Sequence, residues 1–209
     1  MAARGHLCLI LLVAALLVAG CGDESPGSPH PLPSPGESRG EVGMDEAQFW
    51  DLVDSAHREA GLDVARKVAA LKTRLAALSL DELREFCAIW DRTMNRAYDW
   101  KLWAAAYVIH GGCSDDSFSD FRATVISLGR ATFEAALRDP DTLLEVARAA
   151  GGELCEEDLN YVPSDVWGAR TGGESRPSSV PHQEEPHGED WGTDDLPRIV
   201  PKLWKAFGS

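Results

Sequence analysis

The sequence has little positive charge and few cysteines. Its 20 lysine and arginine residues stand against 34 aspartate and glutamate residues, which gives a net charge of −14 at pH 7. This excess of negative charge argues against binding to nucleic acid and to anionic lipid headgroups. Only five of the 209 residues are cysteine, and none of them forms a CxxC pair. We therefore expect no zinc site of a familiar type.

The sequence also lacks an apolar run long enough to cross a bilayer comfortably. The uncharged run at residues 7–18 follows Arg4 and spans 12 residues, whereas a membrane helix needs about 20. A run of this length is typical of a signal peptide. The small residues after it lead into a cysteine, VAGC, which ends at Cys21. This ending resembles the lipobox of bacterial lipoproteins, which implies a diacylglyceryl group on the sulfur of Cys21 and cleavage before it.

An ordinary secretory signal, cleaved after the same small residues, is the alternative interpretation. Lipidation is favoured because Cys21 falls at the cleavage point and a segment with the composition of a tether follows at once. Residues 22–43 contain five prolines with many glycines and serines, and such a segment cannot bury enough surface to fold. We predict a lipoprotein signal peptide at residues 1–20 and a disordered tether at 21–43. The chain is then extracytoplasmic and anchored to the bacterial cell membrane by its N-terminal lipid, with the choice between inner and outer membrane left open.

Export limits the chemistry of the remaining cysteines. Loss of Cys8 with the signal and acylation of Cys21 leave Cys87, Cys113 and Cys155 in an oxidising compartment. At most one disulfide can form among these three, so one thiol stays free.

No segment shows the sustained alternation of a β-strand, and from residue 44 onward the apolar residues recur at helical intervals. Two capping boxes, which begin at Asp45 and Ser79, mark helix starts. Residues 97–112 are apolar on nearly all sides, which is typical of a helix at the centre of a bundle. The sequence predicts an all-α fold with a compact bundle of about six helices over residues 44–152.

Residues 153–209 predict a less regular C-terminal tail. Within it, residues 171–195 are polar and acidic, with proline, glycine and serine, and predict a mobile loop. Residues 196–207 restore an apolar stripe flanked by basic residues, and predict a short amphipathic end. This end can dock on the acidic body of the same chain or on a partner, and we favour docking on the body.

The sharpest candidate for chemistry is the stretch HGGCSDDSFSDFR. A thiol at the start of a helix is activated by the helix dipole, so Cys113 is a candidate nucleophile with His110 as its base. The neighbouring Asp115 and Asp116 would oppose formation of the thiolate. Two glycines that end one helix, followed by a serine and aspartates that start the next, provide a purely structural interpretation, which we favour.

The same stretch offers oxygen ligands for a metal ion. Asp115, Asp116 and Asp120 suit a hard cation, and His110 and Cys113 would add zinc-type ligands. The spacing of these five residues matches no EF-hand loop, and no paired zinc motif supports them.

The aromatic residues Trp100, Trp103 and Tyr107 suggest a ligand pocket, although aromatic residues at helical spacing are more often part of a core. We favour the core.

Three stretches of the chain carry a family resemblance: QFWDLV, AYDWKLWAAAYVIHGGCSDDSFSDFRATVISLGRATFEAAL and the closing LPRIVPKLW. They resemble the bacterial family called domain of unknown function 4240, over nearly all of residues 44–209. The resemblance implies a helical domain with no assigned reaction, cofactor or partner. This chain differs from the usual member in its lipobox and in His110, where a neutral polar residue is usual.

The sequence predicts an exported, lipid-anchored helical domain that acts as a binding or interaction module at the cell envelope. We expect no cofactor and no nucleic acid, whereas a protein partner is compatible with the tail. An enzyme or a metal-binding protein that uses His110, Cys113, Asp115 and Asp116 is the alternative.

Overall fold

The structure is a computed structural model that describes residues 43–208. The predicted signal peptide, the lipidation site Cys21 and nearly all of the tether lie outside the described residues. Over residues 43–208 the chain forms ten α-helices and two 3-10 helices and no β-strand, which confirms the all-α fold. None of these helices combines the length and the apolar character needed to cross a membrane.

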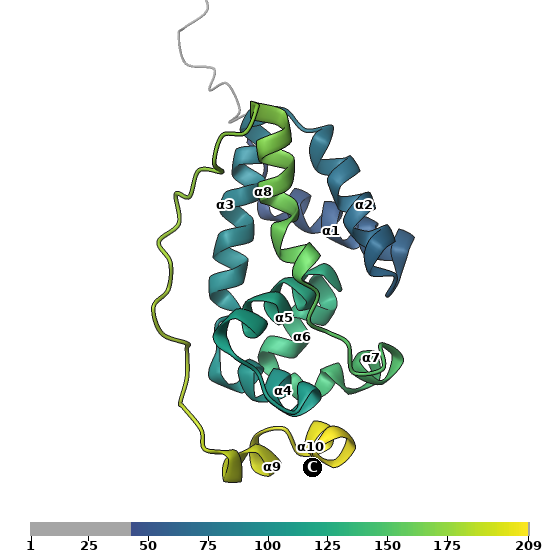
Figure 1. Ribbon diagram of the computed structural model, residues 1–209, viewed down its shortest axis with the longest axis vertical. Helices are drawn as coiled ribbons and strands as arrows, with labels where there is room; N and C mark the ends of the chain where they lie inside the picture. The colour runs from purple at the N-terminus through teal and green to yellow at the C-terminus, as the bar shows by residue number, and fades with distance from the viewer. Residues whose placement is uncertain (1–42, 209) are drawn as a thin grey trace, which may run out of the picture. The chain divides into compact units, whose positions relative to one another are not determined.

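The helices follow one another with short connections up to residue 171 (Figure 1). Their bounds are α1 (Glu46–Ala60), α2 (Val64–Ala76), α3 (Leu80–Arg96), α4 (Trp100–His110), α5 (Asp115–Ser127), α6 (Arg130–Arg138), η1 (Pro140–Leu143), α7 (Leu144–Ala149), α8 (Glu157–Thr171), η2 (Thr193–Asp195), α9 (Leu196–Ile199) and α10 (Pro201–Phe207).

Two details differ from the sequence-based expectation. Residues 44–152 hold more elements than the expected six helices, because Pro140 begins a 3-10 turn, η1, before the short α7. The tail, which we expected to be less regular, also holds a full helix, α8. Pro163 lies inside α8 and is buried, so tertiary packing outweighs its disfavour for a helix interior.

The most central helix is α5, which packs against α1, α3, α4, α6 and α8. Its apolar side chains Phe118, Phe121 and Ile126 have no exposed surface. Its buried hydroxyls are bonded within the helix: Thr124 Oγ1 donates to the carbonyl of Asp120 at 2.9 Å and Ser127 Oγ to that of Thr124 at 2.6 Å. The sequence predicted α4 as the central helix. The polar residues of α5 make its sequence less apolar than that of α4, although their hydroxyls are buried and bonded within the helix.

After α8 the chain returns past α3 and α4 to the C-terminal helices, and we call residues 172–192 the strap (Figure 1). The strap is held by side-chain bonds to α3 and by backbone bonds around His187, whose N–H donates to the carbonyl of Tyr98 at 2.7 Å and whose carbonyl accepts from Trp100 at 2.9 Å. The expected mobility of this segment stays a prediction. Its path, alongside α3, was not visible in the sequence.

The amphipathic end docks on the body of the chain, as expected. α10 packs against α4 and η1, with Leu203 fully buried. The carboxylate of Asp141, itself 5% exposed, accepts hydrogen bonds from the backbone N–H groups of Lys202 at 3.0 Å and Leu203 at 2.9 Å. Because the first N–H groups of a helix have no partner within it, this buried carboxylate caps α10 from a distant part of the sequence.

A second long-range cap begins α6. Gly129 precedes this helix with a φ of 95° and has no side chain to cap it, so Asp54 of α1 accepts the N–H of Arg130 at 2.8 Å instead. A Cβ atom at position 129 would lie 2.5 Å from the same carboxylate oxygen. The glycine therefore serves both the backbone conformation and the approach of α1.

Candidate functional site

The stretch from His110 to Arg122 forms the junction between α4 and α5. α4 ends at His110, Gly111 takes the left-handed conformation with a φ of 68°, and Ser114 caps α5 by accepting the N–H of Ser117 at 3.2 Å. The structural interpretation of this stretch is therefore confirmed, with Ser114 rather than Asp115 as the cap.

The predicted nucleophile and base are not arranged as a reactive pair. The Cys113 thiol donates to the carbonyl of Ser114 at 3.5 Å, and burial, together with the nearby Cys155, raises its pKa to about 12. His110 lies edge-on to Phe121 with ring centres 6.0 Å apart, its Nε2 is enclosed without a partner, and burial lowers its pKa. This environment keeps the thiol protonated and opposes the role of a nucleophile.

The three aspartates of the predicted metal site point to separate partners. Asp115 accepts from the hydroxyl of Tyr98 at 3.0 Å, and Asp120 accepts from the side-chain amide of Asn160, also at 3.0 Å. Asp116 is exposed. Within residues 43–208 no three histidine, cysteine, aspartate or glutamate side chains gather closely enough to hold a metal ion.

The favoured core interpretation holds in part for the aromatic residues of α4: Trp103 and Tyr107 are partly buried against the core, and Trp100 packs against Trp103 and the strap. Trp103 stacks on Phe118 with centroids 4.7 Å apart and on Trp100 at 5.3 Å. Trp191 of the strap meets Tyr107 edge-on at 5.3 Å, and its indole N–H donates to the carbonyl of Trp100 at 2.6 Å. Trp191 completes an aromatic cluster that the sequence could not assemble, because its partners are about ninety positions away.

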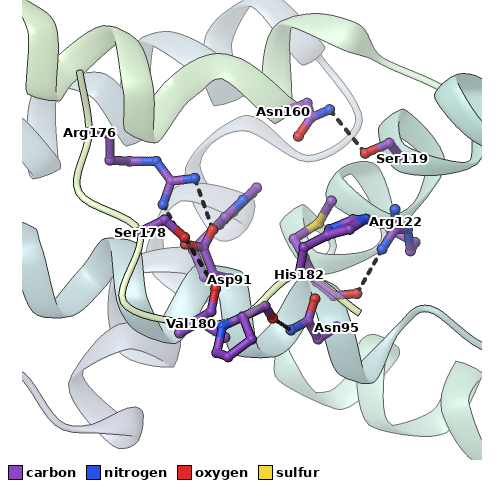
Figure 2. A pocket seen from close by; sticks show the side chains of 12 residues that line it. Asp91, Asn95, Ser119, Arg122, Asn160, Arg176, Ser178, Val180 and His182 are labelled. Carbon is purple, nitrogen blue, oxygen red and sulfur yellow. Dashed lines mark hydrogen bonds and ion pairs between the residues drawn. The ribbon is translucent and has the colours of Figure 1, made fainter. Parts of the chain in front are cut away.

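The structure instead places a polar pocket of about 240 Å³ between α3, α5, α8 and the strap (Figure 2). α5 contributes Ser119 and Arg122, and α8 contributes Asn160. The strap closes one side with residues 176–182, the part of the lining that is not helical. α3 supplies Asp91 and Asn95, which are one helical turn apart and so share a face.

Arg122 is the charged group of the pocket that has no ionic partner. It is 5% exposed, and none of the ion pairs in the described part of the chain includes it. One terminal nitrogen donates to the carbonyl of Met94 at 3.0 Å, while Nε is enclosed without a partner. The guanidinium carbon lies 4.5 Å from the centroid of the Tyr98 ring. Burial lowers the pKa of Arg122, and Asp115 partly offsets this effect.

The second arginine of the pocket is neutralised. Arg176 of the strap forms a two-point ion pair with Asp91, with both N–O distances 2.9 Å, and also donates to the carbonyl of Cys87 at 3.3 Å. Burial opposes the charge of Arg176, but the hydrogen bond and charge of Asp91 outweigh it and raise its pKa. This pair fastens the strap to α3 as a bidentate arginine–carboxylate contact.

The rest of the lining offers neutral polar groups. The amide of Asn95 donates to the carbonyl of Pro181 at 2.8 Å, a second bond between α3 and the strap. The amide of Asn160 reaches Ser119 Oγ at 3.4 Å (Figure 2). The pocket thus combines hydrogen-bonding side chains with one positive charge that lacks a counter-ion.

This pocket could not be predicted as a site from the sequence. Arg122 ends the stretch HGGCSDDSFSDFR, whose cysteine, histidine and aspartates were the predicted site residues. The only available signal was the spacing of Asp91 and Asn95 on one helix face, which is common in solvated helices. The partners of both residues lie on the strap, about 85 positions further along the chain.

The family model described as "Protein of unknown function (DUF4240)" matches residues 44–168. No curated protein and no solved structure matches the chain. The matched range includes α3, α5 and most of α8, and ends before the strap.

Proposed function

The chain belongs to the DUF4240 family, whose description names no activity, and on this premise we propose that it is an exported, lipid-anchored domain that binds a small polar molecule at the bacterial cell envelope. The observation that carries the binding role is the pocket between α3, α5, α8 and the strap, with its unpaired buried arginine.

Recognition fits this lining better than catalysis. The carboxylate of Asp91 is held by Arg176, and Asn95, Ser119 and Asn160 present amides and a hydroxyl, which bind by hydrogen bonds. A concave site with a few placed polar groups is the usual form of a small-molecule site. The volume of about 240 Å³ limits the ligand to a small one.

The export and anchoring part of the proposal rests on the sequence before residue 44. The apolar run, the small residues, Cys21 and the tether-like segment occur in the order that a lipoprotein requires. Three acyl chains, which the lipobox implies, would hold the domain firmly at a membrane, whereas a single chain would not.

The binding role can be tested by ligand-observed NMR with a panel of small polar metabolites. Ser119 is half-buried at the pocket, so Ser119→Leu should fill the pocket and abolish the signal of any true ligand. Ser164 is exposed on α8 and lies outside the pocket, so Ser164→Leu is the matched control and should leave the signal unchanged. A panel without any compound sensitive to the Ser119 change would contradict the proposal.

The anchor can be tested by membrane fractionation. We expect the Cys21→Ala variant to leave the membrane fraction and to lose labelling by a palmitate analogue. The Cys113→Ala variant should behave as the unaltered chain, because Cys113 lies within the folded domain. A Cys21→Ala protein that remains membrane-bound and labelled refutes lipidation at this residue.

A further inference from the structure

We infer that the ligand of the pocket is a small organic anion with one carboxylate group, and that Arg122 is its counter-charge. This inference rests on the proposed binding role of the pocket and adds the chemical class of the ligand.

The first support is the state of Arg122. A buried charge is costly unless it is paired and fully hydrogen-bonded. The carbonyl of Met94 and the ring face of Tyr98 satisfy this guanidinium in part, whereas Nε has no partner. The nearest acidic influence is Asp115, but its carboxylate accepts from the Tyr98 hydroxyl instead of forming an ion pair with Arg122. An anion bound in the pocket would supply the missing counter-charge.

The second support is the charge balance of the lining. Arg176 and Asp91 cancel each other, so Arg122 leaves the pocket with a single positive charge. This balance fits a monoanion better than a dianion. The terminal nitrogen of Arg122 that does not bond Met94 can donate a charge-assisted hydrogen bond to a carboxylate, which fits a carboxylic acid as the ligand.

The remaining walls suit the body of such a ligand. Trp90 and Met94 offer apolar contact, and Asn95, Asn160 and Ser178 offer neutral hydrogen-bonding groups. The chain as a whole carries a net charge of −14, so anions are not attracted to its surface in general. Binding of an anion should therefore depend on this one arginine.

The strap forms one wall of the pocket. Its residues 176–182 form the non-helical wall of the pocket and are held to α3 by the side-chain contacts of Asp91 and Asn95.

The experiment compares butyrate with butyramide, which has nearly the same shape and no charge. The purified full-length chain is titrated with each probe, and the Nε–H signals of its arginines are followed by NMR. A charge-assisted hydrogen bond corresponds to a preference for butyrate of about tenfold or more. The Nε–H signal of Arg122 should move with butyrate and stay in place with butyramide.

Arginine variants assign the preference to a residue. Arg122→Gln should abolish it, and Arg122→Lys should keep part of it because the charge remains. Arg58 is exposed on α1, so Arg58→Gln makes the same change in net charge and should leave the preference intact. If Arg122→Gln does not fold, the signal of Arg122 in the unaltered chain still decides the question.

Three results overturn the inference: equal affinity for the two probes, a preference that survives Arg122→Gln, or an Arg122 signal that does not respond to butyrate. Ser119→Leu separates this failure from a failure of the proposed function. If the two probes bind equally and Ser119→Leu abolishes both, the pocket remains a binding site for a neutral ligand. If neither probe nor any metabolite of the panel is sensitive to Ser119→Leu, both proposals fall.

Discussion

Replacement of Lys67 by methionine should stabilise the protein. Lys67 lies on α2 and is 2% exposed, although a lysine ammonium is among the most strongly hydrated groups in proteins. Its Nζ reaches one side-chain partner, the hydroxyl of Ser127 at 3.4 Å, and that hydroxyl already donates to the carbonyl of Thr124. Burial lowers the pKa of Lys67 from 10.5 to about 8, with the charge of Glu156 opposing the effect.

This change in pKa can be converted into a stability. At roughly 1.4 kcal/mol for each pH unit, the fall in the pKa of Lys67 corresponds to about 3 kcal/mol against the folded state at pH 7. Loss of the hydrogen bond between Lys67 and Ser127 offsets part of this figure, and we expect a gain of about 2 kcal/mol for Lys67→Met. Methionine keeps the unbranched aliphatic shape of the lysine and has no charge to bury.

The gain should depend on pH in a defined direction. Below pH 8 the ammonium is charged in both the folded and the unfolded chain, so the full penalty applies to the unaltered protein. Between pH 8 and 10.5 the unfolded chain binds more protons than the folded one, so the penalty disappears as the pH rises. The advantage of Lys67→Met should shrink across this interval. Burial raises the pKa of Cys87 to about 11, which acts in the opposite direction but equally in both proteins.

The assay is urea unfolding followed by tryptophan fluorescence at pH 7 and at pH 10. Lys72→Met is the matched control on the same helix, because Lys72 forms an exposed ion pair with Asp165. Its removal should change the free energy of unfolding by about 1 kcal/mol or less. The reasoning is refuted if Lys67→Met destabilises the protein at pH 7, or if its gain is the same at both pH values.

Three further outcomes follow from the described contacts. Asp141→Ala removes the buried cap of α10 and should lower the free energy of unfolding by about 2 kcal/mol, with faster hydrogen exchange confined at first to α10. Asp141→Asn keeps one oxygen acceptor and should lower it by less. Gly129→Ala should lower the free energy of unfolding by about 2 kcal/mol or more, measured by thermal unfolding, because of the positive φ and the contact with Asp54. Gly168→Ala, in open space on α8, should raise it by up to about 1 kcal/mol. Cys113, with its pKa raised to about 12, should react with iodoacetamide at pH 8 on the order of a thousandfold more slowly than an ordinary thiol. Labelling of the folded protein as fast as in urea would contradict the burial of this thiol.

The features that the sequence predicted correctly are those that depend on neighbouring residues. The capping boxes at Asp45 and Ser79 form as expected, since each needs contacts only three positions apart. The glycines after His110 end α4 for the same reason. The apolar stripe at the C-terminus also docks as expected, because an amphipathic helix needs another surface to cover its apolar face.

The features that the sequence did not show depend on which distant segments meet. Lys67 lies one turn before Leu71, on the apolar stripe of α2, where a lysine normally extends to solvent. It is buried because α2 packs against α1 and α8 and because its Nζ reaches Ser127 of α5. Arg122 likewise resembles a partner for nearby acids, but its guanidinium lies against the Tyr98 ring and bonds the carbonyl of Met94. Polar residues can be assigned to a core only after the neighbours that cover them are known.

The pocket is formed by two parts of the chain, the helices and the strap. Three walls come from helices within residues 44–168, the range shared with the family, and the fourth lies beyond that range. The strap is fixed at both ends. Before it, Arg170 of α8 donates to the carbonyls of Ala76 and Leu78. At its last residues, the indole of Trp191 donates to the carbonyl of Trp100. Substitutions in residues 177–182 can therefore change the shape offered to a ligand while the helices and their charge stay as they are. In this arrangement selectivity can evolve in a short irregular segment, at little risk to the stability of the domain.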